Sequence, residues 1–382
     1  MKPRVLHVIP MLWSGAGRVV SQLAIAQRAA WDVALVTSGR SKGERDWPVY
    51  RRTIRDAGIP HHPIDFFDRA PDVFWQGVEA LAALVDRWRP DVVHTHAGVP
   101  ACAAAAVRDR TAHAFRHVNH VYNWGAGRSA WMDTMDLAGI RRADAVVCSS
   151  HRYRARLLEG GIDTARLTYV PWGLDLDPIR AAARVSHGRR ARNQAGVGRT
   201  GPRVGFIGRI EPRKGQLELV RGFARLHAAA PGGHLDLVGP VADEEYAAEV
   251  AGAVRRLGLS GAVSMPGKVA NPFGRLAQWD VFVSLSADEG QGLAALEAMA
   301  LGVPVLARPV AGVEDYLEDG VTGWACPDVS PDAVSHGVRR VLADAARPEI
   351  VARARTMVDR TYTFPRTVAA MDRLYQWRRA GA

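Results

Sequence analysis

Two glutamates on either side of a glycine-rich turn carry the clearest chemistry in this chain of 382 residues. Glu289 comes shortly after the apolar run VFVSLS, and Glu297 falls in a helix that we expect over 293–301. Gly290 and Gly292 expose backbone N–H groups where that helix begins. Carboxylates accept hydrogen bonds from sugar hydroxyls, and N–H groups at a helix start bind phosphate. The segment therefore favours a sugar-phosphate ligand.

The same two carboxylates have a competing interpretation as the acid and base of a glycoside hydrolase. Glu297 lies about one turn into the predicted helix, which ends at Gly302 and Pro304. That position suits a carboxylate that holds a ribose better than one that protonates a leaving oxygen. We therefore prefer a binding role to hydrolysis.

A second candidate is the loop GRIEPRKG, which follows the strand-like run VGFIG and precedes an amphipathic helix. Arg209 and Lys214 lie five residues apart in it. A guanidinium forks onto two oxygens and an ammonium adds a point charge, so the pair suits a diphosphate. The residue order does not match G-x-x-x-x-G-K-[ST], so this is not a P-loop. The alternative is that Arg209 and Lys214 are solvent-exposed loop charges that bind no ligand.

A third candidate is Gly15-Ala16-Gly17, directly after the first expected strand. Read as G-x-G-x-x-G it fails, because Val20 replaces the third glycine. Asp32, the nearest acidic residue, begins the second strand instead of ending it. A nicotinamide site is therefore disfavoured. These glycines could still let a ligand approach the backbone where the helix begins. The alternative is that they only form a tight turn between strand and helix.

The elements that must position these residues alternate along the chain. We expect strands at 5–10, 33–37, 92–96, 115–121, 145–149, 167–171, 204–207, 235–238, 263–265, 281–285 and 304–307. Nearly continuous apolar strands separated by helices indicate parallel sheets covered on both faces. A basic stretch at 186–203 divides the series into two doubly wound α/β domains. Two such domains in tandem normally leave a cleft that faces the carboxyl ends of the strands, where ligands bind.

The segment EGQGLAALE followed by AMALGVPVLA, together with GRIEPRKG, closely resembles the retaining glycosyltransferases of family 4. SGAGRVVSQLA, PDVVHTH, ADAVVCSS and YVPWGLD extend the resemblance over nearly the whole chain in the expected order. It implies the GT-B fold, with two Rossmann-like doubly wound domains that face each other across a cleft. The implied domains are 1–185 for the acceptor, with the terminal helix 364–382 packing back on it, a basic linker at 186–203, and 204–363 for the donor.

The resemblance also implies roles for single residues. Arg209 and Lys214 would neutralise the diphosphate of a nucleotide-sugar, Glu297 would bind its ribose, and Glu289 would bind the transferred sugar. The residues assigned to donor binding are Gly15, Arg209, Lys214, Glu289, Gly290, Gln291, Gly292, Leu293 and Glu297. The residues assigned to catalysis are Arg209, Lys214, Glu289 and His120. Gln291 stands where many relatives have Phe, and it could add a polar contact to the sugar.

No metal or resident cofactor is expected, since the nucleotide-sugar is a co-substrate. His94 and His96 alternate on one strand as metal ligands often do, but spacing identifies no third ligand. Asp175-Leu176-Asp177 imitates the D-x-D of metal-dependent transferases, yet it follows a Pro-x-Gly turn and is better interpreted as part of that turn. Cations that meet the diphosphate charge would make a divalent ion unnecessary.

Aromatic and acidic side chains of the first half are candidates for binding the acceptor, with packing and surface charge as the alternatives. These residues are Trp13, Tyr122, Trp124, Trp131, Asp133 and Asp136. Acidic groups there would suit an amine-bearing acceptor.

The chain carries 50 Lys and Arg against 39 Asp and Glu, a net charge of +11. Nucleic acid, an anionic membrane surface or phosphate-bearing small molecules could each explain that excess. Much of it lies in a segment that could equally be a solvated linker. Its cations are Arg189, Arg190, Arg192, Arg199 and Arg203. The three cysteines form no disulfide or zinc pattern, and neither a signal peptide nor a membrane span is evident.

We therefore predict a cytoplasmic, retaining, metal-independent glycosyltransferase. It would move a sugar from a nucleoside diphosphate sugar, with UDP favoured, to a small hydroxylated acceptor such as an aminocyclitol, polyol or glycoside in secondary metabolism. A cell-envelope glycan or a lipid acceptor, with membrane association, is the close alternative. A basic protein that binds nucleic acid or an anionic surface accounts for the charge but leaves the Glu289–Glu297 segment without a purpose. The sequence does not determine the oligomeric state.

Overall fold

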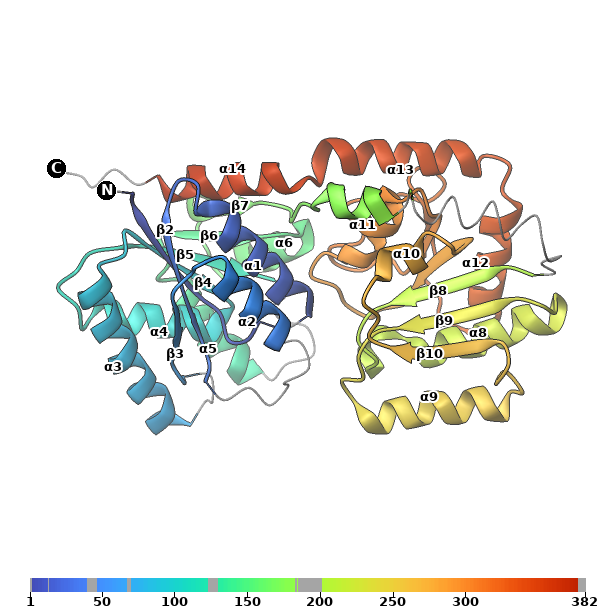
Figure 1. Cartoon of the computed structure of the whole chain (residues 1–382), viewed down its shortest axis with the longest axis horizontal. Helices are drawn as coiled ribbons and strands as arrows, with labels where there is room; N and C mark the ends of the chain where they lie inside the picture. Colours follow the sequence, from blue (N-terminus) through green and yellow to red (C-terminus); the bar gives the residue numbers. More distant parts are fainter. Residues whose placement is uncertain are drawn as a thin grey trace. The chain divides into compact units, whose positions relative to one another are not determined.

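The computed structural model of the chain describes residues 2–12, 14–39, 47–66, 70–122, 130–182, 184 and 201–376. The chain divides into two compact units, Met1–Trp172 with Pro365–Ala382, and Gly173–Phe364 (Figure 1). The basic segment with Arg189, Arg190, Arg192 and Arg199 lies outside the described residues. The domain limits expected from the sequence, with a linker at 186–203, stay a prediction.

The first unit is built on a parallel sheet of seven strands in the order β3-β2-β1-β4-β5-β6-β7 (Figure 1). Its strands are β1 (Arg4–Val8), β2 (Asp32–Thr37), β3 (His61–Pro63), β4 (Val92–His96), β5 (Arg116–Val121), β6 (Ala145–Cys148) and β7 (Leu167–Tyr169). Its helices are α1 (Ser14–Gln27), α2 (Trp47–Asp56), α3 (Pro71–Trp88), α4 (Gly98–Arg108), α5 (Ala130–Ile140), α6 (His151–Glu159), the short η1 (Thr164–Arg166) and α14 (Phe364–Tyr375).

Helix α14 belongs to the first unit although it lies at the far end of the sequence. The indole Nε1 of Trp31 donates to Asp372 Oδ1 at 3.1 Å. The Tyr375 hydroxyl lies 2.5 Å from His94 Nδ1 on β4. These buried polar contacts fix α14 against the sheet.

The second unit contains a parallel sheet of six strands in the order β10-β9-β8-β11-β12-β13. Its strands are β8 (Arg203–Ile207), β9 (His234–Val238), β10 (Val263–Gly267), β11 (Val281–Ser284), β12 (Val305–Ala307) and β13 (Trp324–Ala325). Its helical segments are η2 (Pro212–Lys214), α8 (Gln216–Ala229), α9 (Glu244–Arg256), α10 (Pro272–Leu276), α11 (Leu293–Ala300), α12 (Pro331–Ala343) and α13 (Arg347–Thr361).

Strand β11 explains why this sheet is covered on both faces. Val281 and Val283 point into one apolar cluster, whereas Phe282 points into another. Because neighbouring side chains on a strand face opposite sides, an unbroken apolar strand needs a core on each side. The two parallel sheets confirm the predicted doubly wound α/β architecture. The short edge strands β3 and β13 were not predicted, since HHP and WA carry no β-branched run.

Both sheets reverse their strand order at the same place. In the first unit β1 has β2 on one side and β4 on the other, and in the second unit β8 lies between β9 and β11. Connections that leave the carboxyl ends of two such central strands diverge, and ligands of doubly wound folds bind at that point. The loops after β1 and β4, and those after β8 and β11, are therefore the places to look for a site. No helix among the described residues combines the length and apolarity that a membrane crossing requires.

Candidate functional site

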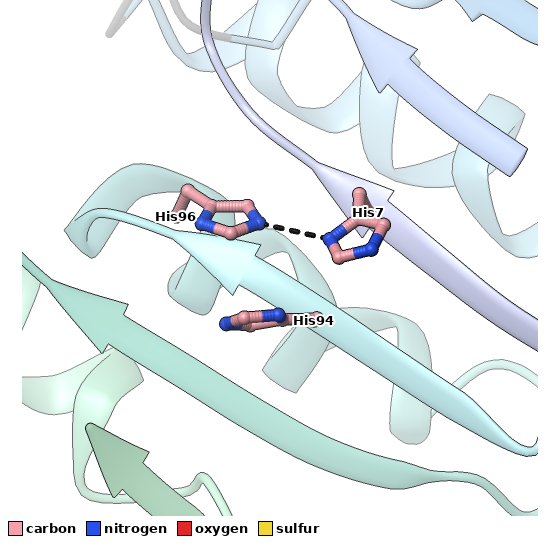
Figure 2. A group of neighbouring side chains, drawn as sticks. All are labelled: His7, His94 and His96. Carbon is pink, nitrogen blue, oxygen red and sulfur yellow. Dashed lines mark hydrogen bonds between the residues drawn. The ribbon is translucent and has the colours of Figure 1, made fainter. Parts of the chain in front are cut away.

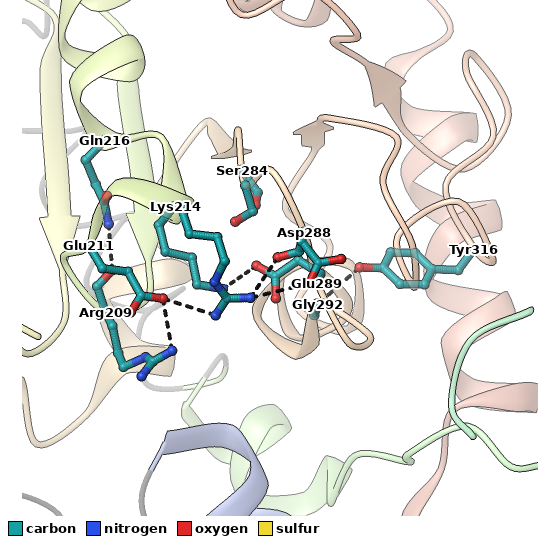
Figure 3. A network of polar contacts seen from close by, with 11 residues as sticks. Arg209, Glu211, Lys214, Gln216, Ser284, Asp288, Glu289, Gly292 and Tyr316 are labelled. Carbon is teal, nitrogen blue, oxygen red and sulfur yellow. Dashed lines mark hydrogen bonds and ion pairs between the residues drawn. The ribbon is translucent and has the colours of Figure 1, made fainter. Parts of the chain in front are cut away.

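The switch point of the second sheet brings the predicted cation loop and the predicted glutamate loop together (Figure 3). Strands β8 and β11 are hydrogen-bonded neighbours, so the loops that follow them leave the same edge side by side. The amide of Ala287 donates to the carbonyl of Arg213 at 2.9 Å, which ties one loop to the other. The local fold therefore gathers side chains that lie about 75 residues apart in sequence.

Lys214 and Glu289 form an ion pair across the two loops, with Nζ 2.6 Å from Oε1 (Figure 3). Only 11% and 17% of the two side chains is exposed. Burial alone would raise the pKa of Glu289, but Lys214, with Ser286 and Arg213, outweighs burial and lowers that pKa. Glu289 is therefore a carboxylate at neutral pH. The sequence predicted both residues at the site but not their pairing.

A second carboxylate, Glu211, joins two guanidinium groups of the same loop. Its Oε1 accepts from Arg209 at 2.9 Å and from Arg213 at 3.1 Å. Arg213 also donates to the carbonyl of Asp288 at 3.2 Å. Sequence reasoning did not single out Glu211, Arg213 or Asp288. The alternating charges of GRIEPRKG were the signal, since a carboxylate between cations in a tight loop orients them.

Glycine at position 215 gives the cation loop its shape. Gly215 has a φ of +71°, and a Cβ there would lie 2.8 Å from the carbonyl oxygen of Leu285. A side chain is therefore excluded both by backbone conformation and by space. The chain turns here from η2 into α8, and the Gln216 side chain donates to the Arg209 carbonyl at 2.7 Å to close the loop.

The glycine-rich turn after β11 ends at the start of α11. Gly292 has a φ of +71°, and Tyr316 OH donates to its carbonyl at 3.0 Å (Figure 3). A Cβ on Gly292 would lie 2.7 Å from that hydroxyl oxygen. The turn therefore requires glycine, and it sets the first amides of α11, from Leu293 onward, at the switch point. Free N–H groups at a helix start attract anions.

The two other predicted residues of this segment are buried. Glu297 lies in α11 with 4% of its surface exposed, and Gln291 lies in the turn with 5% exposed. Glu297 is four residues after Leu293, so it sits about one helical turn from the start of α11. The predicted helix over 293–301 differs from α11 (Leu293–Ala300) by one residue. One continuous segment leads into α11, and it consists of Gly290, Gln291, Gly292 and Leu293.

The carboxyl edge of the first sheet, at β5 next to the switch point, has a different character. His120 on β5 is fully buried, and its ring stacks on Tyr122 at 4.7 Å and on Trp172 at 4.6 Å between centroids. Burial lowers the pKa of His120 to about 3, so the imidazole is neutral at physiological pH. Among the described residues, neither of its ring nitrogens has a hydrogen-bond partner.

Two backbone features mark this edge of the first sheet. Ala97, directly after β4, has φ 100° and ψ 176°, a conformation that costs a non-glycine residue about 1–3 kcal/mol. The Asn119 side chain donates to the Ala97 carbonyl at 3.0 Å and so helps to hold it. Gly15 is exposed near the start of α1, whereas a Cβ on Gly17 would lie 2.5 Å from the Leu12 carbonyl carbon. Gly17 is therefore the glycine that packing requires.

The structure sorts the remaining candidates. Trp13 and Trp124 lie outside the described residues, and Trp131 is 62% exposed on α5. Asp136 is buried, so it is not the surface charge considered from the sequence. The amide of Asp177 donates to Asp175 Oδ1 at 3.4 Å, a local contact of the kind that the turn interpretation expects.

Comparison with known proteins identifies the family. Residues 189–357 match the model "Glycosyl transferases group 1", and residues 13–178 match "Glycosyltransferase Family 4". The chain belongs to the family 4 glycosyltransferases. The predicted family and enzyme class are thereby confirmed, and both sugar-phosphate candidate loops fall within the group 1 match.

Several curated relatives of this family 4 glycosyltransferase are D-inositol 3-phosphate glycosyltransferases. The protein from Mycobacterium tuberculosis is 28% identical, with 98% of this chain and 82% of that protein aligned. The protein from Nocardia farcinica is 31% identical over 68% of this chain. The alignments span only 62% of the length of the Segniliparus rotundus relative and 55% of the Nocardia relative.

Solved structures confirm the GT-B-like fold of this glycosyltransferase. Anabaena Alr3699/HepE, solved in complex with UDP and glucose, has a TM-score of 0.82 at 17% identity over 98% of this chain and 100% of that chain. Sucrose-phosphate synthase from Thermosynechococcus elongatus has a TM-score of 0.80 at 22% identity over 98% of each chain.

Proposed function

We propose that this family 4 glycosyltransferase transfers a hexose from a UDP-sugar to a hydroxyl of a small acceptor, with retention of anomeric configuration. The observation that carries the proposal is the meeting of the two loops after β8 and β11, where Lys214 contacts Glu289 at 2.6 Å. A cation and a carboxylate held this closely can serve the two halves of one ligand, the phosphate and the sugar.

The departing diphosphate is the group that most needs stabilisation during the reaction. In our proposal Arg209 and Lys214 meet its charge, and the first amides of α11 hold the distal phosphate. Glu211 orients Arg209, to which it is bound at 2.9 Å. Fixed donors need no rearrangement as charge develops, and such electrostatic stabilisation is usually the largest single contribution to catalysis.

Glu289 and Glu297 would hold the sugar and the ribose. The lowered pKa of Glu289 keeps it ionised, so it accepts hydrogen bonds from sugar hydroxyls and does not donate a proton. Glu297, buried in α11, would accept from the two ribose hydroxyls. The proposal therefore assigns binding roles to both carboxylates and excludes the glycoside-hydrolase interpretation for them.

Cations at the diphosphate would take the role that a divalent metal plays in other transferases, so we propose that the transfer is metal-independent. We further propose that the leaving phosphate oxygen accepts the proton of the acceptor on the same face of the sugar, which gives retention. His120, with a pKa of about 3, is too weak a base for that proton. As a neutral imidazole, His120 would lie beside the reacting sugar, as the family resemblance implies, without acting as the base.

For the acceptor we propose a small cyclitol or polyol, bound by the first unit. The support is the activity of two curated relatives, D-inositol 3-phosphate glycosyltransferases at 28% and 31% identity. Cell-envelope glycans and lipid acceptors are the alternatives that an acceptor screen separates. Specific binding of nucleic acid has no support in the family match.

The test is thermal unfolding with UDP, GDP, ADP and dTDP, with and without EDTA, followed by transfer assays with the sugars of the nucleotide that binds. A ligand at 100 times its Kd adds about 2.7 kcal/mol to the free energy of unfolding. We expect UDP to raise the Tm of wild type regardless of EDTA, and to have little effect on Glu297→Ala. Glu349→Ala, an exposed glutamate of α13, is the matched control and should respond as wild type does. A UDP effect that survives in Glu297→Ala would contradict the site.

A further inference from the structure

Three histidines converge inside the first sheet, on strands that adjoin at its switch point (Figure 2). His7 lies on β1, His94 and His96 lie on β4, and His7 pairs in register with His94. At most 1% of each side chain is exposed. One nitrogen from each ring lies within 4.8 Å of the others. The sequence offered the alternating pair, but the third member is 89 residues from His96 and no spacing rule connects them.

Each imidazole uses one nitrogen for a hydrogen bond to a neutral side chain around the cluster. These bonds join His7 Nε2 to Gln27 Oε1 at 2.9 Å, His96 Nδ1 to Tyr122 OH at 2.8 Å and His94 Nδ1 to Tyr375 OH at 2.5 Å. Histidines that bind metals normally donate their second ring N–H to a carboxylate, a backbone carbonyl or a water, which fixes the tautomer and orients the ring. Donation from these rings to the Gln27, Tyr122 and Tyr375 oxygens would fix the tautomer and the ring orientation in the same way.

The remaining nitrogens are poorly satisfied by one another. His7 Nδ1 lies 3.1 Å from His96 Nε2, so the two nitrogens share a single proton. His94 Nε2 is buried, and no described residue hydrogen-bonds to it. If the Tyr375 hydroxyl oxygen accepts from His94 Nδ1, then His94 Nε2 carries a lone pair that no described residue satisfies. A buried nitrogen lone pair without a donor is a position that a Lewis acid would satisfy.

The spacing also fits a metal. Zinc–nitrogen bonds of about 2.05 Å place the ligands of a tetrahedral ion about 3.3 Å apart, close to the contact between His7 and His96.

We propose that His7, His94 and His96 form a binding site for a divalent transition-metal ion, with zinc as the best fit. Three neutral nitrogens select zinc, cobalt or nickel over magnesium and calcium, which prefer oxygen ligands. An ion here ties β1 to β4 and, through Tyr375, to α14. The site belongs to the first unit and has no part in the charge chemistry of the donor loops, so the proposal is independent of the proposed function.

Cobalt substitution tests the site without any nucleotide or sugar. The full chain, freed of any histidine tag and stripped with a chelator, is titrated with Co²⁺ while its visible absorption is recorded. We expect one equivalent to bind with the intense bands of tetrahedral cobalt, displaced by Zn²⁺ but not by Mg²⁺. His94→Gln and His96→Gln should weaken Co²⁺ binding by more than about a hundredfold, since loss of an outer partner alone costs 10–100-fold.

His117→Gln is the matched control. His117 is also a fully buried imidazole, on β5, but its Nε2 bonds to Thr95 Oγ1 at 2.8 Å and it is not in the cluster. It should bind cobalt as wild type does. Absent binding, weak octahedral bands, or equal affinity in His94→Gln would each overturn the proposal. If the ligand variants fail to fold by circular dichroism, the coordination bands and stoichiometry of the wild type decide between these outcomes.

Discussion

The two sheets share one strand order at their switch points, yet the side chains that they place there differ in kind. In the second unit the residues are charged and paired, with Lys214 on Glu289 and Arg209 on Glu211. In the first unit they are neutral imidazoles and aromatic rings without a carboxylate partner at His120. The fold fixes where chemistry takes place, whereas the sequence after each central strand decides which chemistry it is. We call the carboxyl edge of the second sheet the charged edge and interpret it as the place where the diphosphate binds. We call the carboxyl edge of the first sheet the neutral edge, and we interpret its rings as contributing shape and not charge.

The largest consequence of this difference is the response to acid. Burial holds the pKa values of five histidines of the first unit, His7, His94, His96, His117 and His120, below 6.5. Since the unfolded chain then binds more protons than the folded chain, stability falls as pH drops below about 6.5 and continues to fall towards the folded pKa values. Each imidazole contributes up to about 1.4 kcal/mol per pH unit.

We therefore expect the first unit to unfold before the second when the pH is lowered from 7 to 5. Hydrogen exchange resolved by peptide measures this directly. Phenylalanine at position 117 removes one titrating group, so the His117→Phe chain should show a shallower pH dependence in the first unit alone. Equal acid sensitivity of both units would contradict the comparison.

The next largest effect is that on sugar transfer when a cation is removed from the charged edge. Arg209→Ala or Lys214→Ala should lower kcat/KM for sugar transfer by about 10²–10³, equivalent to about 2.7–4 kcal/mol of transition-state stabilisation. Arg256→Ala, an exposed arginine at the end of α9, is the control and should stay near wild type. Near-normal turnover of either variant would remove that residue from the proposed mechanism.

The ion pair at the charged edge makes a smaller, pH-dependent contribution to stability. Glu289→Gln should cost about 1.5–3 kcal/mol at neutral pH, because the buried ammonium of Lys214 loses its charged partner. The folded pKa of Glu289 is lowered, so the contribution is present above the ordinary glutamate pKa and is lost as pH falls through the folded value. Urea unfolding of both chains at pH 7 and at a series of lower pH values should show the difference shrink as the pH falls. A difference that persists at low pH would argue against charge as its source.

The smallest effect belongs to the neutral edge. Tyr375→Phe removes the hydroxyl that lies 2.5 Å from His94 Nδ1 and should cost about 1 kcal/mol. The loss should appear as faster hydrogen exchange in α14 and β4, with the second unit unchanged. Tyr362→Phe, in the second unit, tests the specificity of that pattern, since its hydroxyl contacts the Asp315 carbonyl at 3.4 Å.

Much of the fold could be predicted from sequence because local pattern determines it. Apolar runs such as VFVSLS alternate with helical stretches, and that order alone implies doubly wound sheets. The candidate residues Arg209, Lys214 and Glu289 could be proposed because they lie in loops that follow two of the expected strands. Edge strands such as β3 could not be predicted because their sequence has no strand signature.

The rest depended on contacts between distant parts of the chain. The pairing of Lys214 with Glu289 arises because β8 and β11 adjoin in the sheet, and nothing within either loop encodes it. His7 joins His94 and His96 for the same reason, through the pairing of β1 with β4. Strand order is a property of the whole sheet, so residues that meet across it are not visible as a local motif.

The most direct test of the central claim is hydrogen–deuterium exchange with and without UDP. The account predicts slower exchange in the loop 208–215 and in the turn and helix start 287–295, together with little change at His94–His96 and His120. Protection of those two segments by UDP would establish the charged edge as the nucleotide site. Protection confined to the first unit, or none in either loop, would contradict the account.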